Sequence, residues 1–370
     1  MNHKKFFLII LLCMTAMFST ACSENKQSSE NSKNSAATNQ VKEKAEPKKP
    51  SYKAKFKILH SEYIFPYSPD TKLSKDELIL KLSLFVENNG EEQLRLDKSA
   101  FNLYEGDVKT TNNIDITAAD SNEVSKELGY TSLNPGKSIE GTIYFLVDKG
   151  QKYKFAFTPD GDQEYAPIET EIDGKKLLDS AKKLDDPAKA LLAYTDITIF
   201  GKDNDNFEKL TGEHKREVIS EYRESFAKTL FNDLDITTEV DDDKKLNHLI
   251  DTVQHVYQEK TKVKAVTKAI RRGEAIVEAN ITPIDYEKVK KQVKNRHEDY
   301  KKSKGDDFYD DDLLVNPAIK FMTEEIKKAQ QASTEKTVQV TMYNDDNNKW
   351  QLDFEDDGLL DLEYFSSFHK

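Results

Sequence analysis

The stretch LILKLSLFVENNG, residues 78–90, decides the fold of the first half of this 370-residue chain. Leucine occupies every second position of its first seven residues, with isoleucine, lysine and serine between. Successive side chains of a β-strand point to opposite faces, so this alternation predicts a strand with one buried face. The Asn88-Asn89-Gly90 sequence that follows is typical of a tight turn.

Further strands follow at short intervals. Phe101, Leu103 and Tyr104 belong to one run, Ile139 to Val147 form another, and Tyr153 to Phe157 form the last. The turn sequence Asn134-Pro135-Gly136 separates two of these runs. Short strands with regular turn signals predict an all-β sandwich over residues 51–172.

Several of these segments resemble a known family. LNPGK at 133–137, GTIYFLV at 141–147 and YKFAF at 153–157 look like the closing strands of the telokin-like, immunoglobulin-type domain of Gram-positive lipoproteins. VENNG at 86–90 is similar to that domain's early strand and turn. The resemblance implies an immunoglobulin-like sandwich and no catalytic residues.

A second, α+β domain is predicted over residues 173–370. Asp186-Pro187 marks a helix start, because proline suits the first helical turn. An apolar stripe at every fourth position from Val218 to Leu230 predicts an amphipathic helix. Strands at Lys262–Ile270 and Ala275–Ile281 and a closing hairpin at residues 338–354 complete a curved antiparallel sheet, on which the helices pack.

This order of helices and strands resembles the C-terminal domains of uncharacterised Gram-positive lipoproteins. More loosely, it is similar to cone-shaped folds of the nuclear-transport-factor-two or cystatin type. The helices expected between Tyr286 and Gln331 are a departure from those folds, because they interrupt the sheet.

Residues 1–21 read as a secretion signal. Lys4 and Lys5 precede an apolar run, Phe6 to Phe18, which is too short to span a bilayer. Ser19-Thr20-Ala21-Cys22 resembles the lipobox of bacterial lipoproteins, although the lipobox usually has a larger aliphatic residue where Ser19 stands. The resemblance implies that Cys22 receives a diacylglycerol and a further acyl chain such as palmitate. A cleaved signal that leaves Cys22 as a free thiol is the alternative.

Residues 22–50 form a tether behind this cysteine. Its polar composition, with Val41 as the only β-branched apolar residue, cannot bury enough surface to order the segment. The chain carries a net charge of −12, and residues 51–370 alone carry about −16. An acidic body argues against nucleic acid as a partner. We expect a lipid-anchored protein on the outer leaflet of the cytoplasmic membrane, on its extracytoplasmic face.

Two acidic or histidine-containing sets are candidate metal ligands. Asp306, Asp307, Asp310, Asp311 and Asp312 form the densest acidic cluster, which suits weak calcium binding, with a solvated loop as the alternative. His248, Asp251, His255 and Glu259 share one helix face, but the two histidines lie about 10 Å apart along the axis. An ordinary solvated face is the expected reading of this second set.

Catalytic motifs do not emerge from the chain. It contains no Gly-rich phosphate loop, no Gly-x-Ser-x-Gly sequence and no His-Glu-x-x-His sequence, so we expect no enzyme and no cofactor. Four aromatic residues of the second domain could line a ligand pocket, or could fill the core: Tyr194, Phe200, Tyr222 and Trp350.

The leading hypothesis is a non-enzymatic binding or interaction module that contacts another envelope protein. A receptor for a small ligand or a metal, with its pocket in the second domain, is the alternative.

Overall fold

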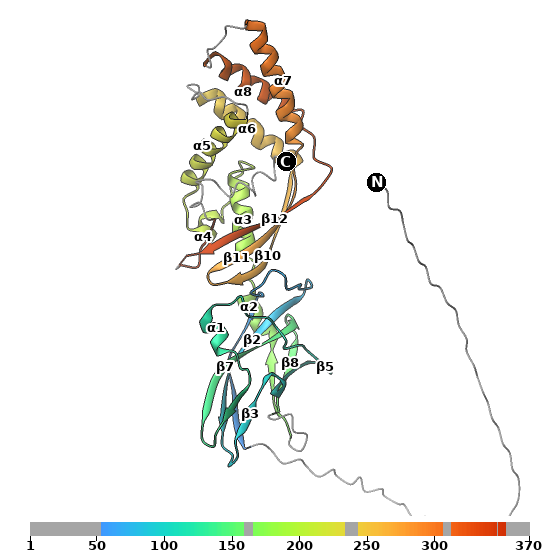
Figure 1. Cartoon of the computed structure of the whole chain (residues 1–370), viewed down its shortest axis with the longest axis vertical. Helices are drawn as coiled ribbons and strands as arrows, with labels where there is room; N and C mark the ends of the chain where they lie inside the picture. Colours follow the sequence, from blue (N-terminus) through green and yellow to red (C-terminus); the bar gives the residue numbers. More distant parts are fainter. Residues whose placement is uncertain (1–52, 159–165, 234–242, 306–311, 346, 353–370) are drawn as a thin grey trace, which may run out of the picture. The chain divides into compact units, whose positions relative to one another are not determined.

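The structure, a computed structural model, describes residues 53–158, 166–233, 243–305, 312–345 and 347–352 (Figure 1). Cys22 and the tether lie outside these residues. No described helix has the length and apolar character needed to cross a membrane.

The N-terminal region is β-rich, and its central strand is the alternating stretch of residues 77–88. A three-stranded antiparallel sheet has the order β1-β2-β7, with bounds Ala54–Ile64, Glu77–Asn88 and Ser138–Asp148. The four leucines that alternate along β2 are buried, as the sequence predicts. Both neighbours of β2 run antiparallel to it, so β2 is hydrogen-bonded along both edges.

A second sheet has the order β5-β4-β8-β9. Its strands are Val108–Lys109, Phe101–Glu105, Lys152–Phe157 and Ile168–Asp173. Tyr153 to Phe157 is therefore not the last strand of the region, because β9 pairs with β8 beyond it. The remaining elements are β3 (Leu94–Leu96), which pairs with β6 (Thr131–Leu133), the short helix α1 (Ser121–Lys126) and the 3-10 turn η1 (Lys98–Ala100).

One hydrophobic core joins the two sheets. The inward residues of β2 pack with Phe101, Phe155 and Phe157 of the second sheet, and the Phe56 ring stacks on Phe155 with ring centroids 5.1 Å apart. Ile79 points to the other face of β2 and is also fully buried, in a small cluster of its own. The two packed sheets agree with the predicted β domain, while its immunoglobulin type stays a prediction.

Two tyrosines link the sheets where the chain leaves the β-rich region. The hydroxyl groups of Tyr63 on β1 and Tyr153 on β8 lie 2.6 Å apart and share a hydrogen bond. The Gly150 N–H donates to the Tyr63 hydroxyl at 2.8 Å, and the Tyr153 hydroxyl donates to the Asp148 carbonyl at 2.6 Å. Burial raises the pKa of both tyrosines, so both hydroxyls stay protonated at neutral pH. Gly174 lies against this pair, with no room for a side chain.

The C-terminal region combines helices with one antiparallel sheet of order β10-β11-β12-β13. Its strands are Lys262–Arg271, Glu274–Thr282, Lys336–Asn344 and Trp350–Leu352, which confirms the strands and the closing hairpin expected from the sequence. Its helices are η3 (Gly174–Leu177), α2 (Leu178–Ala181), α3 (Asp186–Ile197), α4 (Phe207–Thr211), α5 (Lys215–Asp233), α6 (Asp243–Lys260), α7 (Tyr286–Lys304) and α8 (Asp312–Ile326).

Alternate residues of β11 make this sheet one-sided. Ala275, Val277, Ala279 and Ile281 are fully buried in a core shared with residues of the helices. Of the residues between them, Glu278 and Asn280 are partly exposed, and Ile276 is 8% exposed and lies outside this core. The helices therefore pack against one face of the sheet (Figure 1).

Helices α7 and α8 form an excursion between two neighbouring strands. β11 and β12 are hydrogen-bonded partners, although more than fifty residues separate them in the sequence. Backbone hydrogen bonds close the base of the excursion, from Asp285 N–H to the Gln330 carbonyl and from Ala332 N–H to the Pro283 carbonyl, both 2.8 Å. The excursion thus leaves and rejoins the sheet at adjacent points.

The close approach at Gly174 predicts a large effect of a single methyl group. A Cβ atom there would overlap the Tyr63 hydroxyl and would lie 2.5 Å from the Gln151 carbonyl oxygen and 2.7 Å from the Tyr153 ring. We expect Gly174→Ala to lower the free energy of unfolding by about 3 kcal/mol, measured by urea denaturation. Gly129→Ala is the matched control, because nothing lies within 4 Å of that position. Equal stability of the two variants would contradict the packing described here.

Candidate functional site

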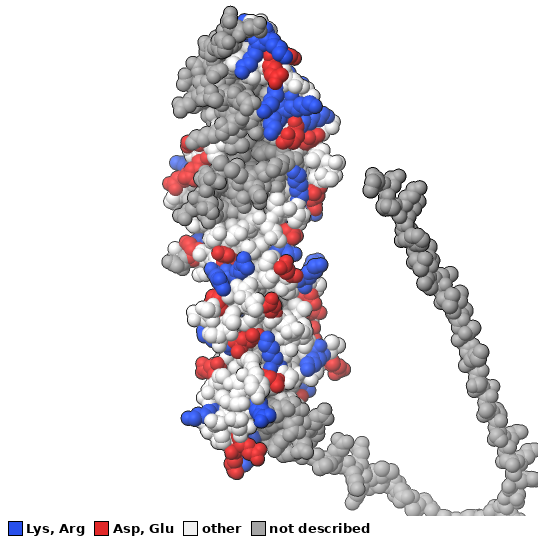
Figure 2. Space-filling model, in the orientation of Figure 1, with Lys and Arg blue, Asp and Glu red and all other residues white. Residues whose placement is uncertain are grey.

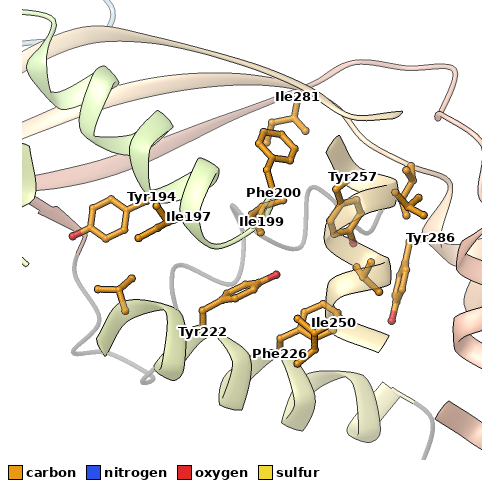
Figure 3. Close-up of a cluster of buried hydrophobic side chains, with 14 of the residues drawn as sticks. Tyr194, Ile197, Ile199, Phe200, Tyr222, Phe226, Ile250, Tyr257, Ile281 and Tyr286 are labelled. Carbon is orange, nitrogen blue, oxygen red and sulfur yellow. The ribbon is translucent and has the colours of Figure 1, made fainter. Parts of the chain in front are cut away.

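Three of the aromatic residues predicted to line a ligand pocket lie in the core of the C-terminal region (Figure 3). Tyr194 on α3 is fully buried, and Phe200 and Tyr222 are 8% and 6% exposed. The Tyr194 ring meets Phe207 edge-on with centroids 4.9 Å apart. Their packing corresponds to the core-filling alternative.

Trp350, the fourth predicted pocket residue, lies on β13 and is 7% exposed in the same core. The cavities described below are not lined by any of the four aromatic residues. A ligand-binding role for these four side chains stays a prediction.

The acidic cluster proposed for calcium falls largely outside the described residues. Asp306, Asp307, Asp310 and Asp311 are not described, and Asp312 begins α8. Calcium binding there stays a prediction.

The members of the histidine set on α6 do not share one partner. Asp251 accepts a hydrogen bond from Arg223 at 2.7 Å, and His255 pairs with Glu259 at 3.3 Å. Among the residues that the structure describes, no three His, Cys, Asp or Glu side chains form a group suited to a metal ion.

A groove between α6, α7 and α8 is the strongest candidate site. We call it the helical groove. Its volume is about 970 Å³, and α8 supplies most of its lining. The lining residues are Lys244, Lys245 and His248 of α6, Tyr300 of α7, Asn316, Pro317, Ile319, Lys320, Phe321, Thr323 and Glu324 of α8, and Lys327 directly after α8.

The spacing of residues along α8 explains how it lines the groove. Residues Val315, Ala318, Met322 and Ile326 lie at helical intervals on its inner face and are buried in the core. The outer face carries Pro317 and Phe321, four residues apart and half-buried, within the groove lining. α8 therefore has apolar side chains on both its inner and its outer face, whereas the outer face of a surface helix is usually polar.

Arg296 on α7 fixes the wall of the helical groove. Its guanidinium donates to Glu324 and to Glu325 of α8, each at 2.7 Å, and its centre lies 4.3 Å from the centroid of the Phe321 ring. The Tyr300 ring, one turn further along α7, meets Phe321 at an angle of 73° with centroids 6.2 Å apart. Arg296 thus holds α7 against α8 and orients the apolar side chains of the groove.

The same arginine determines the charge state of Glu324, the one carboxylate among the described residues that line the groove. Its hydrogen bond holds the pKa of Glu324 below the ordinary value, so Glu324 is ionised at neutral pH. Lysines border the groove on both sides, and Lys and Arg side chains also gather over α7 in Figure 2. Within the described residues, Lys244, Lys320 and Lys327 form no ion pair. Lys245 contacts Asn316 at 2.8 Å and so links α6 to α8.

Two further cavities lack this combination. One of about 580 Å³ is lined by residues that include Lys75, Glu77 and Asp185, and one of about 780 Å³ runs along β1 and β9. The first is lined by four lysines and two carboxylates and the second by three of each, whereas the described lining of the helical groove has four lysines and one carboxylate.

Sequence reasoning did not identify the helical groove. Its lysines were not singled out in the sequence, and the position of α6 opposite α8 depends on the fold. A usable signal was present, since Pro317 and Phe321 are apolar residues on the polar side of the α8 pattern.

A buried carboxyl group in the same region was also missed. Glu213 lies in the turn between α4 and α5, and its Oε2 atom is buried without a hydrogen-bond partner among the described residues. Burial, with a smaller contribution from Glu221, raises the pKa of Glu213 to about 7. The folded state therefore favours the protonated carboxyl.

Comparison with known proteins identifies the family. The model described as a domain of unknown function (DUF5105) matches residues 177–368, more than half of the chain. The chain belongs to this family. A second domain of unknown function (DUF4352) matches residues 27–165. The two matches agree with the predicted division into two domains.

The relatives are lipoproteins. Uncharacterized lipoprotein YcdA of Bacillus subtilis (strain 168) is 34% identical over 360 residues, which cover 96% of both chains. The crystal structure of a lipoprotein (ycdA) from Bacillus subtilis subsp. subtilis strain 168 superposes with a TM-score of 0.73, over 87% of this chain and 98% of that one. These likenesses confirm the prediction of a two-domain lipoprotein of Gram-positive type.

The raised pKa of Glu213 predicts how stability depends on pH. Protonation favours the folded state, so this contribution is complete below about pH 4.5 and is lost as the pH rises through about 7. Glu213→Gln removes the ionisable group. We expect the variant to be more stable than the wild type by about 1–2 kcal/mol at pH 8, after allowing for partial exposure, and equally stable at pH 4.5.

Urea denaturation at the two pH values measures this difference. Glu217→Gln, which removes an exposed carboxyl on α5, is the control and should change neither value by more than about 0.5 kcal/mol. An unchanged pH dependence in Glu213→Gln would refute the assignment.

Proposed function

We propose that this chain is a lipid-anchored, non-enzymatic binding module on the outer face of the cytoplasmic membrane. In this proposal the helical groove contacts another protein of the envelope. The observation that carries it is the apolar lining of the groove, formed by Pro317, Phe321 and Tyr300 on an otherwise charged group of helices. Binding sites are commonly concave and lined by apolar and aromatic side chains with a few polar groups, which is the composition of this groove.

The rigidity of the groove supports this role. Arg296 makes two charge-assisted hydrogen bonds and also stacks on Phe321, so the wall is ordered before any partner arrives. A preorganised surface loses less conformational entropy on binding than a mobile one.

The anchor is proposed on two grounds. The lipobox-like sequence ends at Cys22, and the relative named above is a lipoprotein. Two acyl chains would hold the protein stably on a bilayer, whereas one gives only marginal binding.

A receptor for a small ligand is the second candidate. The groove volume of about 970 Å³ lies within the range of small-molecule sites, which favours this alternative. Native mass spectrometry of the chain purified from its parent bacterium separates the two candidates. A reproducible additional mass would favour the receptor, and a clean apo mass would favour the protein-binding module.

Site-specific photo-crosslinking in living cells tests the proposed function. A benzophenone amino acid replaces Thr323, which lines the helical groove, or Thr337, which is exposed on the open face of the sheet. We expect a discrete crosslinked protein from position 323 that is absent from position 337. Identical crosslinking profiles at both positions would contradict a binding role for the groove.

The anchor is tested by substitution of the two cysteines. Cys22→Ala removes the acylated sulfur, so we expect loss of metabolic labelling by a palmitate analogue and about a tenfold smaller membrane-bound fraction. Cys13→Ala is the matched control, because Cys13 lies within the predicted signal, and it should keep both labelling and membrane binding. A Cys22→Ala chain that remains labelled and membrane-bound would exclude this residue as the lipid site.

A further inference from the structure

The charge of the helical groove contrasts with the charge of the chain. Residues 51–370 carry about −16, yet four lysines border the groove. Among the described residues, Glu324 is the only carboxylate in the lining, and it already pairs with Arg296. The groove is thus a local basic surface on an acidic body, and it would attract anionic groups.

We propose that the helical groove binds an acidic amphipathic helix of a partner protein; this inference rests on the proposed function and specifies the chemistry of the partner. Carboxylates of that helix pair with the lysines at the border. Its apolar side chains contact Phe321, Pro317 and Tyr300. Helix-in-groove binding commonly combines such an apolar stripe with flanking charges.

The spacing of the lysines matches a helix laid along α8. Lys320 lies on α8 and Lys327 directly follows its last residue, so the seven-residue interval between them corresponds to about two helical turns, or about 10 Å along the axis. Two acidic residues seven positions apart on a partner helix have the same separation. Phe321 lies directly beside Lys320, so apolar and charged contacts form in parallel rows along the groove.

Charge and shape favour a protein segment over a membrane surface. An anionic bilayer would meet the acidic body as well as the groove, and like charges repel. The groove is also concave, and its ordered aromatic wall gives room for side chains rather than for a flat layer of headgroups.

The chain itself contains a segment of similar chemistry. Residues 353–370 hold six Asp or Glu and seven Phe, Leu or Tyr residues, and they lie outside the described residues. This segment is therefore a competing occupant, and the experiment includes it.

Peptide binding to the full lipidated chain in non-ionic detergent tests the proposal. The probe is a fluorescent 18-residue synthetic helix with leucines on one face and glutamates seven positions apart beside them. The comparison peptide has lysine in place of each glutamate. Fluorescence anisotropy measures the affinity for the wild type, for the double variant Lys320→Glu with Lys327→Glu, and for the control Lys288→Glu with Lys291→Glu. The control lysines are exposed on α7 and do not line the groove.

We expect the glutamate peptide to bind the wild type with a Kd on the order of 10 µM, and the lysine peptide at least tenfold more weakly. The groove variant should lose at least tenfold in affinity for the glutamate peptide, and the control variant less than about twofold. Thermal unfolding of each variant verifies that the chain is folded.

Three results would overturn the proposal. The first is equal affinity of the wild type for the two peptides, or equal affinity of the wild type and the groove variant for the glutamate peptide. The second is loss of binding to phosphatidylglycerol vesicles in the groove variant while peptide binding is kept, because the occupant would then be the membrane. The third is markedly tighter peptide binding when Asp361→Asn and Glu363→Gln are introduced into the full chain, because the chain's own segment would then occupy the groove.

The outcome is distinguishable from failure of the proposed function. A crosslink from position 323 together with charge-independent peptide binding would leave the binding module intact and would reject the acidic partner alone. Absence of that crosslink would reject the binding module itself.

Discussion

The C-terminal region depends on the burial of one row of side chains. Ala275, Val277, Ala279 and Ile281 occupy every second position of β11, so their side chains share one face of the sheet, and this face forms the core with the helices. The helices must therefore share that face. α8 buries one side in this core and leaves the other beside α6 and α7. The helical groove is thus a consequence of a sheet with a single apolar face.

The β-rich region depends on a second constraint, a pair of buried tyrosine hydroxyl groups whose hydrogen bonds join the two sheets. The Tyr63 and Tyr153 side chains connect one strand of each sheet and also bind the backbone at Asp148 and Gly150. A buried polar pair is favourable only if its hydrogen bonds are made, and these are. The absence of a side chain at Gly174 leaves room for the chain to pass next to them.

Most of the fold could be predicted because its signals are local. The alternation of residues 78–84 and of the closing hairpin is visible in the sequence, and so is the helix start at Asp186-Pro187. β9 was missed, since it follows a segment with few apolar residues, and its pairing with β8 depends on the fold. The aromatic residues could not be assigned to core or pocket from the sequence, because the same residue types fill a protein core and line a ligand pocket. The groove joins residues of three helices, so no single stretch reveals it.

The way in which the excursion of α7 and α8 joins the sheet affects where the sequences of this family can vary. It begins and ends at neighbouring backbone positions, closed by the hydrogen bonds of Asp285 and Ala332. Substitutions on the outer faces of α7 and α8, away from the core, can therefore leave the pairing of β11 with β12 unchanged. The surface of the helical groove can therefore vary while the sheet beneath it keeps its strand pairing. Relatives with the same sheet can differ at this surface.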